Sequence, residues 1–246
     1  MNEGTVAAAF LHPGEYAACF AESLADVLFS DLLGPQRIVP NGQKMAKLCS
    51  AGGIVDGRNK LTAAFLEGEC EWLWFVDSDM GFAPDTLERL IESADPVERP
   101  VLGALCFALR VNGRKDYGAI RYMVSPTLYD WCDQGEAVGW LARRDYERDA
   151  LQPVGATGAA CVLLHRSALE RIAERFGPVW WDQITHPVGP TTFSEDLSFC
   201  VRAAAVDLPV WVDTRIKTTH AKGGVFLDED AYDRDRMVND VEASGR

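Results

Sequence analysis

The chain has 246 residues, of which 48% are hydrophobic and 25% are charged, a composition typical of a folded globular protein. Its formal net charge of −13 argues against a nucleic-acid-binding surface, because such surfaces cluster Lys and Arg. The seven cysteines form no CxxC pair and no zinc-like spacing, so we expect buried free thiols in a reducing cytosol.

Strands and helices alternate in the N-terminal part of the sequence. The expected elements are a strand at 5–11, a helix at 16–33, a short strand and turn at 37–42, a helix at 57–69, a strand at 71–76 and a helix at 83–94. The first strand stops at a turn signal that contains Pro13 and Gly14. Pro84 suits the first turn of the helix that follows it.

The rest of the chain continues the same alternation with one irregular region. We expect a buried strand at 101–109, short strands and loops over 110–154, a strand running into a helix at 158–176, a loop at 177–193, a helix at 195–206, and a strand pair or one bent strand at 208–220. This order predicts an α/β layer architecture. We expect one catalytic domain over 1–227 and a charged tail or solvated helix over 228–246.

Nothing in the sequence predicts a membrane segment. No apolar run approaches the roughly 18–20 residues that span a bilayer, and MNEGTVAAAFLHPGEY lacks the basic start of a signal peptide. We therefore expect a cytoplasmic protein without a transmembrane segment, although peripheral attachment through a partner stays open.

Two aspartates at the end of a strand give the strongest chemical signal. Asp77 and Asp79 follow the aromatic strand EWLWFV, and side chains two residues apart in an extended chain point to the same side. Open α/β sheets bind ligands at this edge, and paired carboxylates there suit Mg²⁺ or Mn²⁺ with a diphosphate. The structural alternative is that one Asp caps the next turn while the other is solvated.

Three segments together resemble the GT-A glycosyltransferases. The segment GRN…EWLWFVDSDMGFAPDTLERLI resembles the core with its DxD strand, ATGAACVLLHRSALERI the acceptor-side strand, and FSEDLSFCVRAAAVDLPVWVDTRIKTTHAKGG the "ED" helix and closing His. They cover residues 5–225, and the pattern looks closest to small glycosyltransferases of bacteria and phages. The resemblance implies a Rossmann-like three-layer α/β/α sandwich with a mostly parallel sheet.

The same resemblance implies a function. It is the metal-dependent transfer of a sugar from a UDP- or GDP-linked donor to a protein, glycan or lipid-linked sugar acceptor. The location would be the bacterial cytoplasm, or the host cytoplasm if the chain is phage-encoded. Donor identity, acceptor identity, oligomeric state and the choice between retention and inversion stay open.

A metal and donor site would form around the DxD motif. The resemblance assigns the metal, Mn²⁺ or Mg²⁺, to Asp79, and assigns Asp77 to the donor ribose or to the metal, with Ser78 between them. It makes His220 a third metal ligand, and Lys222 could steady the departing diphosphate. The structural alternatives are that His220 is an ordinary hydrogen-bonded histidine at a strand end and that Lys222 is an exposed loop lysine.

Two acidic residues open the expected helix at 195–206. Acidic side chains there can cap the helix and complement its dipole. By the resemblance, one of Glu195 and Asp196 faces the acceptor, where an inverting transferase needs a base; we favour Asp196. In a retaining enzyme this carboxylate would orient the substrate instead.

Further residues are candidates for the nucleotide pocket. Arg58, beside Asn59, could contact the nucleotide or its diphosphate, or lie on the surface at a helix start. The turn His12-Pro13-Gly14 lies where a base pocket is expected, or is simply a turn.

The loop at 177–193 is a candidate lid. Trp180 and Trp181 could stack on a sugar or close over the donor, and the loop would exclude water. Equally, both side chains could anchor the loop in the core.

Three other functions compete with this one. A sugar-phosphate nucleotidyltransferase should carry a Gly-rich basic loop after the first strand, but the chain has LHPGEYAAC there. A haloacid-dehalogenase-type phosphatase also uses DxD at a strand end, but the string DSDMG lies behind another α/β unit. A non-catalytic carbohydrate-binding or scaffold protein could keep the fold.

Overall fold

The computed structural model describes residues 5–38, 46–49, 52–114, 120–134, 137–186 and 192–244. The helices are α1 (Ala18–Leu33), α2 (Ile54–Glu67), α3 (Thr86–Ser93), α4 (Arg166–Phe176), α5 (Glu195–Ala204) and α6 (Glu229–Ser244). The strands are β1 (Val6–His12), β2 (Ala46–Cys49), β3 (Trp72–Val76), β4 (Met80–Phe82), β5 (Val101–Leu105), β6 (Phe107–Arg114), β7 (Ile120–Pro126), β8 (Leu128–Gln134), β9 (Ala137–Ala142), β10 (Leu151–Val154), β11 (Ala156–Thr157), β12 (Cys161–His165), β13 (Ile184–Thr185), β14 (Thr192–Phe193), β15 (Val210–Lys222) and β16 (Val225–Leu227).

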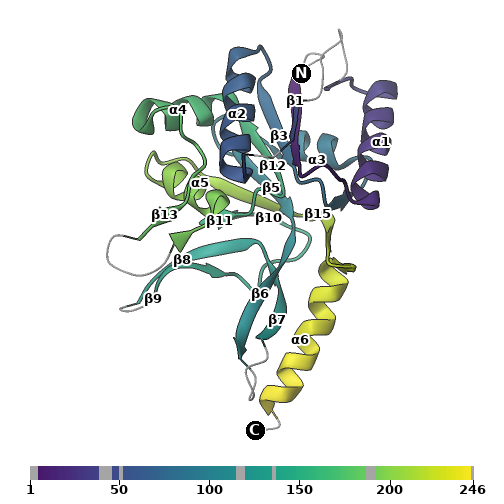
Figure 1. The fold of residues 1–246 in the computed structure, drawn as a ribbon, viewed down its shortest axis with the longest axis vertical. Coiled ribbons are helices and arrows are strands. Elements are labelled where there is room, and N and C mark those ends of the chain that lie inside the picture. The colour runs from purple at the N-terminus through teal and green to yellow at the C-terminus, as the bar shows by residue number, and fades with distance from the viewer. Residues whose placement is uncertain are drawn as a thin grey trace.

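A mostly parallel sheet forms the centre of the molecule. Its strand order is β10-β15-β5-β12-β3-β1-β2. Strands β2, β1, β3, β5 and β15 run in one direction, and β12 and β10 run in the other. Figure 1 shows the sheet between helices on both sides, with the carboxyl ends of β1 and β3 pointing toward the lower half of the view. The α/β prediction is confirmed.

Alternating side chains of the strands build a core on each face of the sheet. In β3, Leu73 and Phe75 join the core that α2, α4 and α5 cover, whereas Trp72, Trp74 and Val76 join the core beneath α1 and α3. Full burial of such a side chain stabilises the fold by about 1.5–3 kcal/mol. The strand is therefore apolar throughout, as expected for one covered on both faces.

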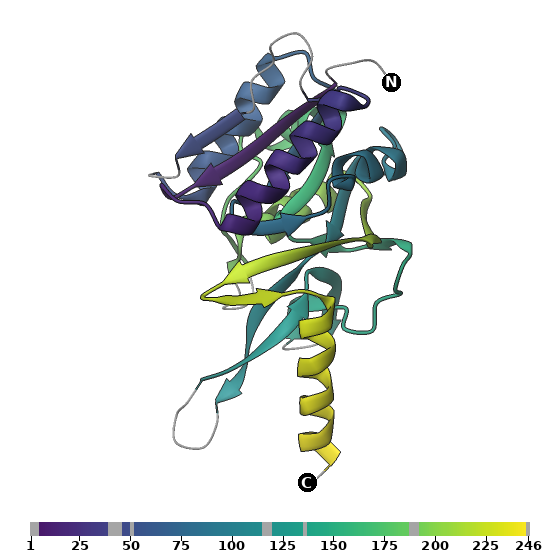
Figure 2. The same cartoon turned by 90° about the vertical axis from the view of Figure 1, so that its right-hand side faces the viewer.

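The lower half of the molecule consists of hairpins and the last helix. The hairpins β6–β7 and β8–β9 extend below the sheet, and α6 runs beside β7 (Figure 2). One face of α6 is docked rather than solvated. Tyr232 is 1% exposed, its ring packs near Phe107 and Tyr146, and its hydroxyl donates to the Arg144 carbonyl at 2.6 Å.

Some predicted boundaries differ from the structure. The strand expected at 101–109 is two strands, because the chain turns at Cys106, whose carbonyl accepts a hydrogen bond from the Thr127 amide at 2.9 Å. A strand at 46–49 pairs with β1 and was not predicted. Of the strand and turn expected at 37–42, residues 39–42 lie outside the described residues. The seven cysteines, all within the described ranges, are free thiols. Four are buried as predicted, but Cys49 is exposed and Cys19 and Cys132 are half-buried.

The last long strand bends, as one of the two sequence alternatives predicted. The first part of β15 pairs with β5 and β10, and its far part pairs with β4 and β16. The register shifts between Asp213 and Lys217. Within this bend, Asp213 accepts hydrogen bonds from the backbone amide and guanidinium of Arg215 and from the Ser93 hydroxyl. The bend carries the end of β15 across to β4.

The two adjacent tryptophans are core anchors and not surface platforms. Trp180 and Trp181 are 2% and 1% exposed, and their indole N–H groups donate to the Leu169 carbonyl and the Thr62 hydroxyl. The Asn59 amide clamps this loop from α2. Its Oδ1 accepts from both tryptophan backbone amides at 2.9 and 3.1 Å, and its Nδ2 donates to the Trp181 carbonyl at 2.7 Å. Residues 187–191 of the expected lid lie outside the described residues.

Within the described ranges, no helix is both long enough and apolar enough to cross a membrane.

Asn59→Ala should destabilise the fold, because it leaves two backbone amides without their acceptor. The expected loss is about 2–4 kcal/mol, since an unsatisfied buried polar group costs roughly 1–3 kcal/mol. Urea unfolding measures it, with Lys60→Ala as the neighbouring control, because the Lys60 side chain is 64% exposed. Equal stability of the two variants would contradict the clamp.

Candidate active site

The DxD motif forms a turn at the carboxyl end of β3. The Asp77 amide donates to the Ala160 carbonyl at 2.8 Å, which fixes the strand end, and the Met80 amide donates back to the Asp77 carbonyl at 3.1 Å. The Ser78 carbonyl accepts from the Ala17 amide at 3.0 Å, next to the start of α1. The turn therefore holds three half-buried side chains, those of residues 77–79, at the edge of the sheet where ligands bind.

Strand pairing brings His220 to this turn. His220 is the register partner of Met80, and the Ala221 amide donates to the Asp79 carbonyl at 2.8 Å. As a result, His220 Nε2 lies 3.2 Å from Asp79 Oδ1. On the other side, Lys222 Nζ lies 2.6 Å from Asp79 Oδ2. Three residues from opposite ends of the chain thus meet, as the sequence predicted for a donor site.

The His220 ring is held in an orientation that suits a metal. Its Nδ1 lies 2.8 Å from the Phe107 carbonyl, which can only accept, so Nδ1 carries a proton. The opposite atom, Nε2, is buried and has no hydrogen-bond partner among the described residues. Nε2 lies 3.2 Å from Asp79 Oδ1, so either a proton or a metal ion can lie between the two side chains. A cation between Nε2 and Asp79 would satisfy both, so these residues fit Mn²⁺ or Mg²⁺.

The surroundings of Asp79 favour its ionised form. Burial alone would raise its pKa, but the interactions with His220 and Lys222 outweigh this effect and lower the pKa to about 2. The carboxylate is therefore charged at neutral pH. Lys222 is 44% exposed, and its long, flexible side chain can move away from Asp79 when a ligand arrives.

Arg58 lies inside the protein, which corrects the expectation that it contacts the nucleotide. It is 2% exposed, and Nη2 donates to Asp77 Oδ1 at 2.8 Å. Its Nη1 donates to the Ala159 carbonyl at 3.2 Å, and Nε lies 3.6 Å from Glu195 Oε1. The guanidinium also lies over the rings of Phe75 and Trp181. Arg58 can act on a ligand only through the carboxylates that it holds.

The pairing with Arg58 separates the roles of the two DxD carboxylates. Burial raises the pKa of Asp77, and Arg58 only partly offsets this effect. Among the described residues, no three His, Cys, Asp or Glu side chains group closely enough to hold a metal. The ligand set of Asp77, Asp79 and His220 that the sequence predicted does not form such a group: Arg58 holds Asp77 beside the Asp79–His220 pair.

The two acidic residues at the start of α5 face different neighbours. Glu195 is turned toward Arg58; burial and Asp196 raise its pKa, and Arg58 counteracts them. Asp196 Oδ1 accepts from the Leu197 amide at 2.8 Å and from the Ser194 hydroxyl. Asp196 Oδ2 faces Gly158, where an added Cβ would lie 3.5 Å away. One oxygen of Asp196 thus holds the helix start while the other lies over Gly158, beside the Thr127 side chain.

The turn after β1 lies at the same sheet edge. His12 Nδ1 accepts from the Gly14 amide at 3.2 Å, and the His12 ring packs edge-on against Tyr16 with centroids 5.1 Å apart. Gly14 has φ of 110°, which favours glycine, and Pro13 and Gly14 are exposed. This turn leaves the aromatic side chain of Tyr16 46% exposed.

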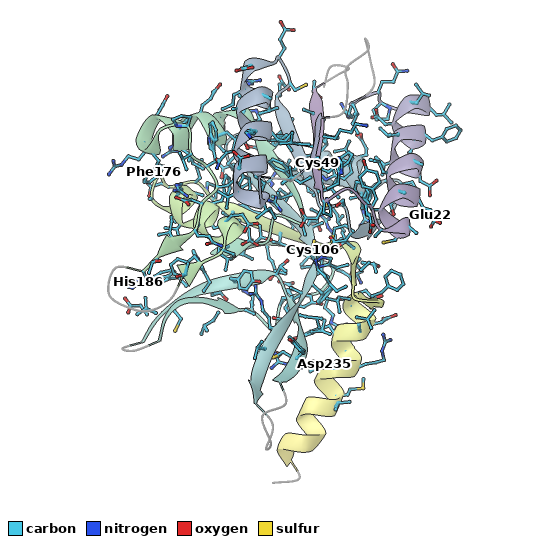
Figure 3. All side chains as sticks on the ribbon, viewed as in Figure 1. Glu22, Cys49, Cys106, Phe176, His186 and Asp235 are labelled. Atoms are coloured by element: carbon cyan, nitrogen blue, oxygen red, sulfur yellow. The ribbon has the colours of Figure 1, made fainter. Side chains whose placement is uncertain are left out.

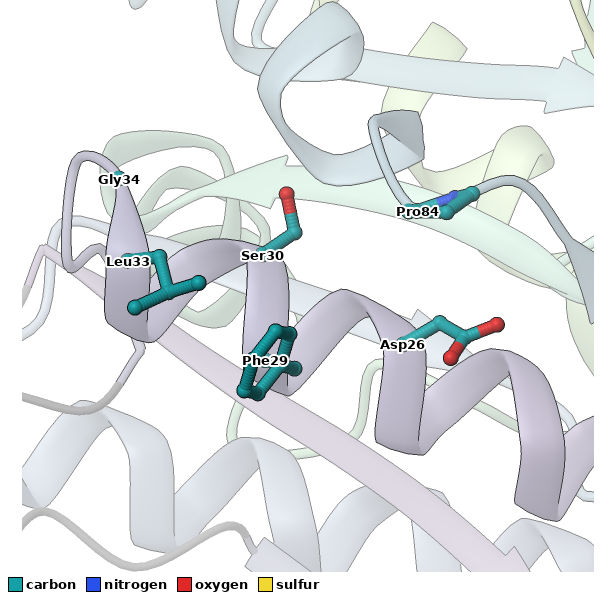
Figure 4. Close-up of a pocket in the computed structure, with 6 residues that line it drawn as sticks. All are labelled: Asp26, Phe29, Ser30, Leu33, Gly34 and Pro84. Carbon is teal, nitrogen blue, oxygen red and sulfur yellow. The ribbon is translucent and has the colours of Figure 1, made fainter.

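A surface pocket of about 490 Å³ lies elsewhere, on the outer side of α1. Figure 4 shows its lining residues, Asp26, Phe29, Ser30, Leu33, Gly34 and Pro84. None of the candidate site residues lines it, so we do not assign the donor to this pocket.

The sequence analysis missed several groups of the site. The carbonyls of Phe107 and Ala159 orient His220 and Arg58, but a backbone oxygen carries no residue-type signal. Tyr129 was also missed, although the Asp196 carboxylate is near enough to help raise its pKa. It lies in the region 110–154, which has no clear sequence periodicity.

Comparisons with known proteins show the fold. No protein-family model matches the sequence, and no curated protein matches it. The structure is similar to A197 from STIV, with a TM-score of 0.53 and 15% identity over 94% of this chain and 92% of that chain. It is also similar to GalNAc-T7, solved with UDP, GalNAc and Mn²⁺, with a TM-score of 0.53 and 10% identity. That match covers 89% of this chain and 44% of GalNAc-T7. The fold is thus that of the GT-A glycosyltransferases.

Arg58→Met should destabilise the protein by roughly 3 kcal/mol, because removal of one partner leaves buried carboxylates uncompensated. Adding Asp77→Asn should recover part of that loss. Denaturant unfolding of both single variants and the double variant measures the coupling. If the two single substitutions had additive effects on the free energy of unfolding, the Arg58–Asp77 interaction would be contradicted.

Proposed function

We propose that the chain is a metal-dependent glycosyltransferase that uses a nucleoside diphosphate sugar, with UDP preferred over GDP. The observation that carries the proposal is the His220–Asp79 pair, in which an unpartnered buried Nε2 faces a carboxylate 3.2 Å away. The fold supports it, because the pair lies at the ligand-binding edge of a GT-A sheet. The UDP and Mn²⁺ in the GalNAc-T7 structure support the donor class.

The donor end of the site combines metal ligands with one mobile cation. Asp79 and His220 would hold Mn²⁺ or Mg²⁺, which when bound supplies Lewis-acid stabilisation of the leaving diphosphate. Lys222 would leave Asp79 and donate to a phosphate oxygen. Asp77, held by Arg58, would face the ribose, with Ser78 and the turn His12-Pro13-Gly14 near the nucleoside.

The acceptor end requires a carboxylate that can take a proton. Asp196 suits this role because its Oδ1 is fixed by the Leu197 amide while Oδ2 lies over Gly158. Glu195 is engaged by Arg58, so it suits a positioning role better. In an inverting reaction, Asp196 Oδ2 would accept the proton of the acceptor hydroxyl as that oxygen attacks the anomeric carbon.

We place this activity in the cytoplasm, where the seven thiols would stay reduced.

Asp79→Ala and His220→Ala should each lower Mn²⁺-dependent donor turnover at least about 100-fold, because each removes a ligand of the ion that stabilises the leaving group. Release of nucleoside diphosphate from UDP- and GDP-sugars measures this effect, with Asp26→Ala as a surface control. All three variants should stay folded by circular dichroism.

A thermal-shift titration separates the competing outcomes. UDP with Mn²⁺ should raise the melting temperature more than either alone. Turnover that persists unchanged with EDTA would contradict metal dependence, and Lys222 would then be the group that binds the phosphate. Binding of UDP without any donor turnover would instead indicate a non-catalytic sugar-nucleotide binder.

A further inference from the structure

A short backbone strip leads away from the proposed base. Residues 155–158 include β11, which pairs with β8 so that Ala156 lies opposite Tyr129. At one end, Gly158 faces Asp196 Oδ2; at the other end, a Cβ on Gly155 would lie 2.7 Å from the Trp140 ring. Three extended residues span about 10 Å. This strip therefore connects Asp196 with an aromatic group on the β8–β9 hairpin.

That aromatic group presents one exposed tryptophan. Trp131 is 45% exposed although three rings pack on it, those of Trp140, His186 and Phe193, with centroids 5.0, 6.4 and 6.0 Å away. Figure 3 shows His186 beside the β8–β9 hairpin and below α5. Packing on three sides fixes the indole ring, so it can receive a ligand at little cost in side-chain entropy.

Trp131 lies on the same strand as Tyr129, which pairs with Ala156 of the strip 155–158. Tyr129 is two residues earlier, so both side chains leave β8 on the same side, about 7 Å apart. The guanidinium of Arg110 contacts the Tyr129 hydroxyl. Tyr129 is buried and Trp131 is 45% exposed, so this face of β8 reaches the surface at the indole.

The surroundings of Trp131 favour a sugar over a lipid. Its neighbours along the strand are Asp130, Cys132 and Asp133, and Asp133 is exposed on the same side as the indole. Asp130 lies on the other face of the hairpin, paired with Arg143. An aromatic face beside one exposed carboxylate, that of Asp133, matches a pyranose ring, which has an apolar C–H face and a rim of hydroxyls. A lipid chain would require a continuous apolar surface.

Resting on the proposed function, we propose that the acceptor is a glycan, and that Trp131 binds a pyranose ring of it by stacking. Trp131 binds the acceptor and does not touch the donor.

Trp131→Ala should raise KM for a glycan acceptor about five- to tenfold, because an aromatic contact contributes roughly 0.5–1.5 kcal/mol, and should leave kcat within about twofold. Trp131→Phe should keep most of the binding. The probes are methyl glycosides of common hexoses and their disaccharides, with a UDP-sugar that the enzyme turns over. Leu141→Ala is the matched control, because Leu141 is 57% exposed on the same hairpin and lies opposite Asp130, on the other face.

Donor hydrolysis without acceptor should be equal in all four proteins, which shows that the donor site is intact. Equal KM values for Trp131→Ala and Leu141→Ala would overturn the proposal, as would transfer only to peptides or polyprenyl phosphate. If no UDP-sugar is turned over at all, the proposed function fails. Saturation-transfer NMR with the same glycosides then still shows whether Trp131 binds a sugar. Binding that Trp131→Ala removes and Leu141→Ala keeps supports the site, and no binding overturns it.

Discussion

The candidate site depends on the antiparallel pairing of β4 with the far part of β15. This contact places His220 opposite Met80, one residue beyond Asp79. The pairing requires the bend in β15, where the strand leaves β5 and crosses toward β4, and Asp213 holds that bend through hydrogen bonds to Arg215 and Ser93. Without the bend, the last residues of β15 would extend past the sheet edge, and the DxD turn would lack its histidine.

A buried guanidinium links the two ends of the site. Arg58 contacts Asp77 on the donor side and Glu195 on the acceptor side, and the ring faces of Phe75 and Trp181 cover it. Burying these charges is tolerable only because they compensate one another. The arrangement fixes the distance between the end of β3 and the start of α5, so donor and acceptor groups would be held in register before either substrate binds.

The sequence predicted the fold class and the DxD edge because both depend on patterns within single segments. The run from Trp72 to Val76 is apolar on both faces, and acidic residues follow it directly. Burial of Arg58 could not be predicted, because a helix-start arginine looks the same whether the adjoining loop covers it or leaves it exposed. The surroundings of Tyr129 and Trp131 could not be predicted for another reason. Both lie on β8, whose register is set by pairing with β9 and β11 and not by local periodicity.

The central claim is that Asp79 and His220, whose Oδ1 and Nε2 atoms lie 3.2 Å apart, together bind a divalent cation. Nitrogen NMR of the imidazole rings tests it most directly, with His220 assigned by His220→Ala. The account predicts that the His220 Nε2 resonance shifts when Mg²⁺ and UDP are added together, while Nδ1 keeps its proton for the Phe107 carbonyl. An Nε2 resonance that does not respond to Mg²⁺ and UDP would contradict it.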